Sequence, residues 1–191
     1  MSEPSLYQRL MGPAFERLPP ALRELHGSTG GFEARGSCEV RRGSGMLSRL
    51  LGRIVGVPPS AERLPLHFTV EVADGGERWI RRFGGHVMGS GFVALDGRLQ
   101  ERLGPVVLVH DLECADGGLH TRLRSMRFLG VPVPRWLHPR LRAFAHEDAG
   151  IYRFDVAAEL PVAGLIVAYR GTLQLDDRRP VDDGTDPIPN L

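Results

Sequence analysis

The segment "IYRFDVAAEL", residues 151–160, decides the fold of this chain. Apolar side chains occupy every second position, and mostly charged side chains occupy the positions between them. A period of two residues is typical of a β-strand with one buried face and one solvated face. The apolar set is Tyr152, Phe154, Val156, Ala158 and Leu160, against Arg153, Asp155 and Glu159. We therefore predict a strand that turns one face toward the interior.

The same alternation recurs along most of the chain. Asp-Gly steps at 74–75, 96–97 and 116–117 separate alternating segments, and such steps are strong signals for β-hairpins. A long series of hairpins tends to curl, and closure into a barrel removes the exposed edges. The sequence predicts a mainly β (α+β) fold, a strongly curved antiparallel meander or lipocalin-like barrel of about nine or ten strands. A flatter sheet wrapped around one helix is the alternative.

Helical patterns occur in two places. Residues 1–30 predict a helical N-terminal segment, in which Ser5 caps one helix and Pro20 opens another. Residues 44–56 carry apolar side chains at helical spacing, with Arg49 and Arg53 on the opposite side, and predict a crossover helix. We expect one globular domain over residues 1–175, with the antiparallel sheet in 31–175. Residues 176–191 predict an acidic, proline-rich, disordered tail.

Composition excludes several classes of protein. All 24 basic residues are arginine, yet the net charge is only +1, which is too weak for a dedicated nucleic-acid binder. The chain shows neither a signal peptide nor an apolar run long enough for a transmembrane segment, so we expect a cytoplasmic protein. Two distant cysteines, seven scattered histidines and the lack of phosphate-loop or dinucleotide motifs predict no metal, no cofactor and no catalytic residue.

His110 is the first candidate site residue. It shares parity with Val106, Leu108, Leu112 and Cys114 on the predicted inner face of residues 106–114. A buried imidazole needs a hydrogen-bond partner. His110 is therefore either a core histidine bonded to a neighbouring group, or a polar anchor that meets a ligand or carries a proton. Asp111 and Glu113 fall on the opposite face and would need a bulge to reach it.

The other candidates are aromatic or basic. Arg81 has the parity of Trp79 and Phe83, so it is either a solvated outer residue or, if it points inward, a clamp for a carboxylate or phosphate group. Trp79, Tyr152 and Tyr169 are candidates for an apolar lining. Small inner residues such as Ala158 leave room for a cavity, unless the helices fill that space.

The segment "RFLGVPVPRWLHPR", residues 127–140, interrupts the strand rhythm. Its prolines fix φ and remove ladder hydrogen bonds, so we expect an extended piece and one turn of helix near 135–138. Three roles suit so rigid and apolar a connection: a lid over a pocket, a membrane-facing wedge, or a packed corner between strands. Trp136 is a ligand-binding candidate under the first role, because it would close one end of the container.

Four stretches together resemble a bacterial family, the domain of unknown function numbered 4166. They are "MGPAFERLPPALRELHG", "RRGSGMLSRLLGRIVGVPP", "ERWIRRFGG" and "LGVPVPRWLHPR", and the resemblance covers roughly residues 5–175. The family also occurs on the C-terminal side of saccharopine-dehydrogenase-like reductases, which implies a reductase as a partner. The resemblance implies no activity and no catalytic residues.

These observations lead to three functional hypotheses. The first is a binder of a small hydrophobic or lipid-like ligand inside the curved sheet, without enzymatic activity. The second is an accessory module that docks on a reductase partner. The third is an isomerase or cyclase that depends on His110.

Overall fold

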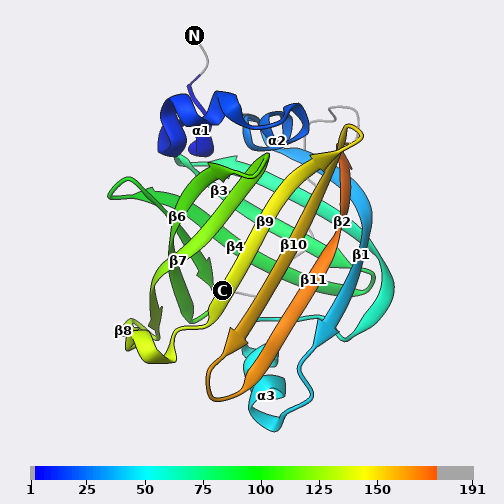
Figure 1. Ribbon diagram of the computed structural model, residues 1–191, viewed down its shortest axis with the longest axis vertical. Helices are drawn as coiled ribbons and strands as arrows, with labels where there is room; N and C mark the ends of the chain where they lie inside the picture. Colours follow the sequence, from blue (N-terminus) through cyan, green and yellow to red (C-terminus); the bar gives the residue numbers. More distant parts are fainter. Residues whose placement is uncertain (1–2, 176–191) are drawn as a thin grey trace.

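The computed structural model describes residues 3–175, most of which lie in β-strands (Figure 1). The helical elements are α1 (Leu6–Met11), the 3₁₀ helix η1 (Gly12–Arg17), α2 (Pro20–His26), α3 (Met46–Ile54) and the 3₁₀ helix η2 (Arg135–Leu137). The strands are β1 (Phe32–Arg42), β2 (Ala61–Ala73), β3 (Gly76–Phe83), β4 (His86–Leu95), β5 (Arg98–Leu103), β6 (Val106–Ala115), β7 (Gly118–Phe128), β8 (Val131–Pro132), β9 (Arg140–Asp148), β10 (Ile151–Leu160) and β11 (Gly164–Leu175). The predicted tail, 176–191, lies outside the described residues.

Ten strands close into an antiparallel barrel. Their order is β6-β5-β4-β3-β2-β1-β11-β10-β9-β7, and β7 pairs again with β6. The link between β7 and β9 is short, because only residues 118–121 of β7 pair with residues 143–146 of β9. The other end of β7 pairs with the two-residue strand β8. The prediction of a curved meander or barrel is confirmed, and the flatter alternative is wrong because the sheet closes on itself.

The segment that predicted the fold forms β10, and its alternation places the apolar face inside. Tyr152, Phe154, Val156, Ala158 and Leu160 all line the interior of the barrel. On the neighbouring strand β11, a register shift opposite Ala158 and Glu159 interrupts the strict alternation. Both Ile166 and Val167 therefore face the interior, although they are consecutive in the sequence.

The N-terminal helices cover one end of the barrel (Figure 1). Ser5 caps α1 as predicted, since its hydroxyl accepts a hydrogen bond from the Gln8 backbone while the Gln8 side chain accepts one from the Ser5 backbone. The helices press Leu6, Tyr7 and Leu22 into the core, where each is at most 3% exposed. This end of the barrel is therefore sealed by side chains.

Helix α3 lies at the opposite end (Figure 1). It spans Met46–Ile54 and is two residues shorter at each end than the predicted 44–56. Gly45 occupies the N-cap without a side-chain bond. Gly56, with φ of 74°, supplies the left-handed residue that ends the helix. The hydroxyl of Ser48 donates to the Ala163 carbonyl at 2.9 Å and ties α3 to the turn between β10 and β11.

Candidate functional site

A cavity of about 290 Å³ lies inside the barrel. Its wall is contributed by strands on all sides, by Tyr7 and His26 at the sealed end, and by Leu51, Ile54 and Val55 at the α3 end. Most of the lining side chains are aliphatic or aromatic. An interior of this kind is typical of a site for a small apolar molecule.

Aromatic rings pack closely where the cavity meets the N-terminal helices. The Trp79 ring lies 4.5 Å from that of Phe92 and 6.2 Å from that of Tyr7, measured between centroids. Its indole nitrogen donates a hydrogen bond to the Glu77 carboxylate at 2.8 Å. Trp79 is therefore held at both its face and its edge, and forms a rigid wall of the cavity.

Two buried groups beside Trp79 have strongly shifted pKa values. Burial raises the pKa of Glu77 to about 7, although the hydrogen bond from Trp79 and the charge of Arg9 oppose the shift. Burial lowers the pKa of His26 to about 3, and its Nε2 shares a hydrogen bond with the Tyr152 hydroxyl at 3.3 Å. The sealed end therefore holds a neutral imidazole near neutral pH.

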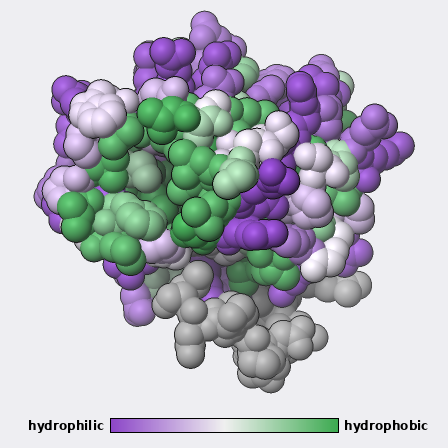
Figure 2. Space-filling model, turned by 90° about the horizontal axis from the view of Figure 1, so that it is seen from below, coloured by the Kyte–Doolittle hydropathy of each residue, from purple (hydrophilic) through white to green (hydrophobic). Residues whose placement is uncertain are grey.

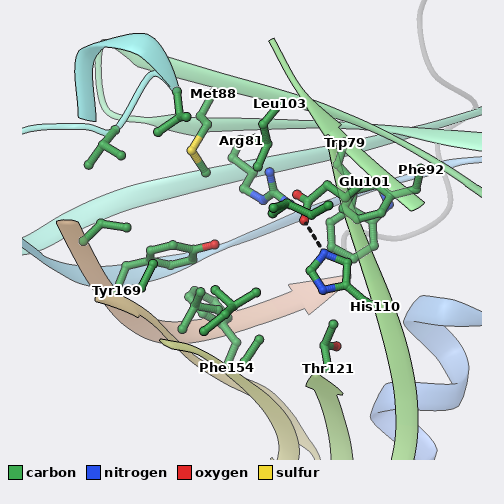
Figure 3. A pocket seen from close by; sticks show the side chains of 18 of the residues that line it. Trp79, Arg81, Met88, Phe92, Glu101, Leu103, His110, Thr121, Phe154 and Tyr169 are labelled. Atoms are coloured by element: carbon green, nitrogen blue, oxygen red, sulfur yellow. Dashed lines mark hydrogen bonds and ion pairs between the residues drawn. The ribbon is translucent and has the colours of Figure 1, made fainter. Parts of the chain in front are cut away.

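A polar cluster interrupts the apolar wall, formed by Arg81, Ser90, Glu101 and His110 from β3, β4, β5 and β6. Figure 3 shows Arg81, Glu101 and His110 of this cluster. His110 Nε2 lies 3.2 Å from a carboxylate oxygen of Glu101. The Arg81 guanidinium donates to the Ser90 hydroxyl at 3.0 Å. Arg81, Ser90 and His110 are each at most 8% exposed, so the cluster is buried among apolar side chains.

The fixed charges of this cluster compensate each other. Burial opposes ionisation of Glu101, but hydrogen bonds from His110 and Ser90 and the charge of Arg81 lower its pKa below the ordinary value. Glu101 is therefore ionised near neutral pH, beside an arginine that is always charged. The guanidinium also lies 5.2 Å from the centre of the Trp79 ring, which adds a cation–π contact.

Two buried ring nitrogens of cavity-lining residues, His110 Nδ1 and His26 Nδ1, have no hydrogen-bond partner among the described residues. The Tyr169 hydroxyl points from β11 toward the polar cluster across the cavity (Figure 3), and burial raises its pKa, so it stays protonated. A ligand with a hydrogen-bonding group would satisfy these atoms, because buried polar groups normally have partners.

The cavity reaches the surface at the α3 end. Ile54 lines the cavity and is 39% exposed, whereas Tyr7 and His26 at the other end are at most 3% exposed. Phe128 and Leu141, which also line the cavity near the α3 end, are half-buried. We call this end the mouth of the barrel.

Five of the six predicted ligand-binding candidates line this cavity. They are Trp79, Arg81, His110, Tyr152 and Tyr169. The sixth, Trp136, lies on η2 outside the cavity wall and is 70% exposed. Arg81 points inward, as the clamp hypothesis requires. The alternative, a solvated residue on the outer face, is wrong because Arg81 is only 8% exposed.

The sequence prediction missed Glu101. The signal was present, because Glu101 alternates with Leu99 and Leu103 and so shares their inward face on β5. Asp111, which its parity places on the face opposite His110, bonds Arg98 on the outside at 2.9 Å. The carboxylate that contacts His110 therefore comes from the neighbouring strand β5 and not from β6.

Neither a metal cluster nor a spanning helix is found within residues 3–175. No three His, Cys, Asp or Glu side chains there gather closely enough to hold a metal ion. The helices in this range are too short or too polar to cross a membrane.

Comparison with curated proteins finds no match for this chain. Residues 18–173 match the family described as "Domain of unknown function (DUF4166)", which confirms the resemblance seen in the four sequence stretches. Because the match covers most of the 191 residues, the chain belongs to the DUF4166 family.

Proposed function

We propose that the protein binds a small hydrophobic molecule, with one uncharged polar group, inside the barrel. The observation that carries this proposal is the buried, unbonded Nδ1 of His110 at the wall of an otherwise apolar cavity. The apolar part of the ligand would contact Trp79, Phe154 and their neighbours. Its polar group would bond His110 Nδ1 or the Tyr169 hydroxyl.

Charge balance favours a neutral polar group over the acidic head group expected for an arginine clamp. Glu101 is the only carboxylate among the residues that line the cavity, and its charge compensates that of Arg81. A second carboxylate would bring an uncompensated negative charge into a low-dielectric space, which is unfavourable. A hydroxyl or amide would donate to His110 Nδ1, and a ketone or ester would accept from the Tyr169 hydroxyl, without that cost.

Native mass spectrometry of the freshly purified protein tests for a bound ligand. We expect a species heavier than the bare chain, from which organic solvent extracts a neutral, apolar molecule. A bare chain that co-purifies with a reductase would instead favour the accessory-module hypothesis and contradict the binder.

A fluorescence assay tests the site itself. The chain has two tryptophans, so Trp136→Phe leaves Trp79 as the only one. Prodan, an apolar fluorophore with one carbonyl, absorbs where tryptophan emits, and we expect energy transfer from Trp79 to bound prodan. Decanol should displace prodan at lower concentration than decanoate, which has the same chain length and a carboxylate. Stronger displacement by decanoate would contradict the neutral-group proposal.

A second candidate function is proton transfer on the bound molecule. The contact between His110 and Glu101 favours it, because a carboxylate that orients an imidazole is a common arrangement for general acid–base catalysis. The test compares molecules extracted from the wild type and from His110→Gln after expression in the same host. An isomerase or cyclase would yield a molecule of different chromatographic retention from the variant, whereas a binder would yield the same molecule from both.

A further inference from the structure

Helix α3 has Leu51 and Ile54 at the cavity wall, but it turns its other apolar residues away from the protein. Met46 is 82% exposed and Leu50 is 55% exposed, while the buried positions of the helix are Ser48 and Gly52. A surface helix normally buries its apolar stripe. Here small residues make the contact with the barrel, because Ser48 bonds Ala163 and the side chain of Arg42 packs over Gly52. Among residues 3–175, nothing covers the apolar side of α3.

Two further apolar projections lie at the same end of the barrel. Leu129, Val131 and Trp136, in the connection between β7 and β9, are 71%, 66% and 70% exposed, and Val162, in the turn between β10 and β11, is 63% exposed. Figure 1 places the turn between β10 and β11 beside α3 and the connection between β7 and β9 farther to the left at the same end, and Figure 2 shows apolar side chains gathered on this end of the molecule. We define the mouth rim as Met46, Leu50, Leu129, Val131, Trp136 and Val162. Such a gathering marks an interaction surface.

Two of the three segments of the mouth rim carry charges of one sign, whereas the third, the turn with Val162, follows Glu159. The sequence has no carboxylate between Glu39 and Glu62 and none between Asp116 and Glu147, the stretches that supply α3 and the connection from β7 to β9. The same stretches supply exposed arginines, Arg49, Arg53, Arg127, Arg135 and Arg140. None of these five pairs with a carboxylate of residues 3–175. The complementary partner is therefore apolar and negatively charged.

We propose that the mouth rim docks on the surface of a membrane that contains anionic phospholipids. An amphipathic helix with exposed leucines and arginines, together with a tryptophan, is the composition of an interfacial membrane anchor. The apolar rim residues would enter the boundary between head groups and acyl chains, and the arginines would contact lipid phosphates. The exposed apolar side chains come from three separate segments. A bilayer surface can contact all three at once.

Docking at the mouth would place the cavity opening against the hydrocarbon boundary. A hydrophobic ligand could then pass between bilayer and cavity without crossing water, which avoids the cost of hydrating its apolar surface. This transfer rests on the proposed ligand-binding function. The docking itself does not, because Leu50 and Trp136 are not part of the cavity wall.

Vesicle flotation of the full chain tests the proposal. The vesicles contain phosphatidylcholine alone or equal parts of phosphatidylcholine and phosphatidylglycerol. We expect the wild type to float with the anionic vesicles and to dissociate as salt is raised. Leu50→Glu should reduce the partition coefficient about tenfold or more, because it removes one inserted side chain and adds a repelled charge. Leu95→Glu is the matched control, since Leu95 is 47% exposed on β4 outside the mouth rim, and it should float like the wild type.

Prodan binding, measured on the same variants without vesicles, separates the two proposals. Leu50→Glu should bind prodan like the wild type, so a loss of flotation with unchanged prodan binding supports docking. A wild type that does not float with anionic vesicles, or a Leu50→Glu variant that floats equally well, would overturn it. Docking would also be overturned if the wild type were a dimer that Leu50→Glu dissociates without any change in flotation.

Discussion

The imidazole of His110 on β6 lies 3.2 Å from the carboxylate of Glu101 on β5, and both side chains face the inside of the barrel (Figure 3). The two residues are not directly opposite each other, because Glu101 pairs with Leu108 and His110 pairs with Leu99. They meet diagonally across neighbouring strands on one face of the sheet. This contact couples the charge of Glu101 to the only histidine in the polar cluster.

A double-mutant cycle should measure this coupling. We expect His110→Leu to reduce the free energy of unfolding by about 1–2 kcal/mol, because Glu101 keeps its contacts with Ser90 and Arg81. Glu101→Leu should cost about 3–5 kcal/mol, because it leaves the buried Arg81 without its counter-charge. The double variant should cost little more than Glu101→Leu alone. Urea unfolding gives all three values, and costs that add to within about 0.5 kcal/mol would contradict the coupling.

Filling the cavity should abolish ligand binding without unfolding the barrel. Ala158 on β10 lines the cavity, whereas Ala157 faces the outside. We expect Ala158→Phe to weaken prodan binding about tenfold or more, because the phenyl ring occupies space that the ligand needs. Ala157→Phe introduces the same side chain on the other face and should bind prodan like the wild type. Equal binding by the two variants would show that prodan does not enter the barrel.

Glu77 should make the protein less stable as the pH rises. Its pKa is raised from 4.5 to about 7 in the folded chain, so the unfolded chain releases its proton first. Between about pH 4.5 and pH 7 the folded state holds more protons than the unfolded state, and stability falls with rising pH, by up to about 3 kcal/mol. Glu77→Gln keeps an acceptor for Trp79 but cannot titrate. Urea unfolding at a series of pH values should show this decrease in the difference between the wild type and the variant, from which the opposite contribution of His26 cancels.

His26 should have the opposite effect on the acid side. Its pKa is lowered from 6.5 to about 3, so below about pH 6.5 the unfolded chain binds a proton that the folded chain excludes. Stability should therefore fall as the pH decreases from 6.5 toward 3. In His26→Gln the loss of stability on acidification should be smaller, while the decrease in stability with rising pH that is due to Glu77 remains. If the loss of stability below pH 6.5 were the same in that variant as in the wild type, His26 would be hydrated rather than buried.

The inner face of the barrel could be predicted from the sequence because a strand has a strict period of two. The inward positions of β10 follow directly from "IYRFDVAAEL", and the same parity placed His110 inside. Arg81 has the parity of Trp79 and Phe83, but a charged side chain inside an apolar wall is uncommon, so the sequence left both the outer and the inward position open. Only the presence of Glu101 and Ser90 on neighbouring strands makes the buried guanidinium tolerable.

Contacts between distant segments could not be predicted. The pairing of His110 with Glu101 depends on the register of β5 against β6, which the sequence does not specify. The orientation of α3 was equally inaccessible, because an amphipathic pattern normally predicts a buried apolar side. The contacts of Ser48 and Gly52 with distant residues reverse that expectation.

The short pairing between β7 and β9, here called the seam, should be the least stable strand pairing in the barrel. It contains only four paired positions, and Gly118 begins it opposite His146. A Cβ atom added at Gly118 would lie 2.3 Å from the Ala145 carbonyl oxygen and 2.6 Å from the Phe144 ring, so the strands would have to separate. We expect Gly118→Ala to reduce the free energy of unfolding by about 2 kcal/mol or more.

The matched control for this seam is Gly91→Ala on β4, where an added Cβ would meet no atom within 4 Å. That substitution should be neutral or slightly stabilising, because alanine restricts the unfolded chain. Hydrogen exchange reports on the seam directly: in Gly118→Ala the amides of residues 143–146 should exchange faster than in the wild type, while those of β10 and β11 stay protected. If both variants were equally stable and equally protected, the pairing of β7 with β9 would not hold the barrel closed. The N-terminal helices and the remaining strands alone would then enclose the cavity.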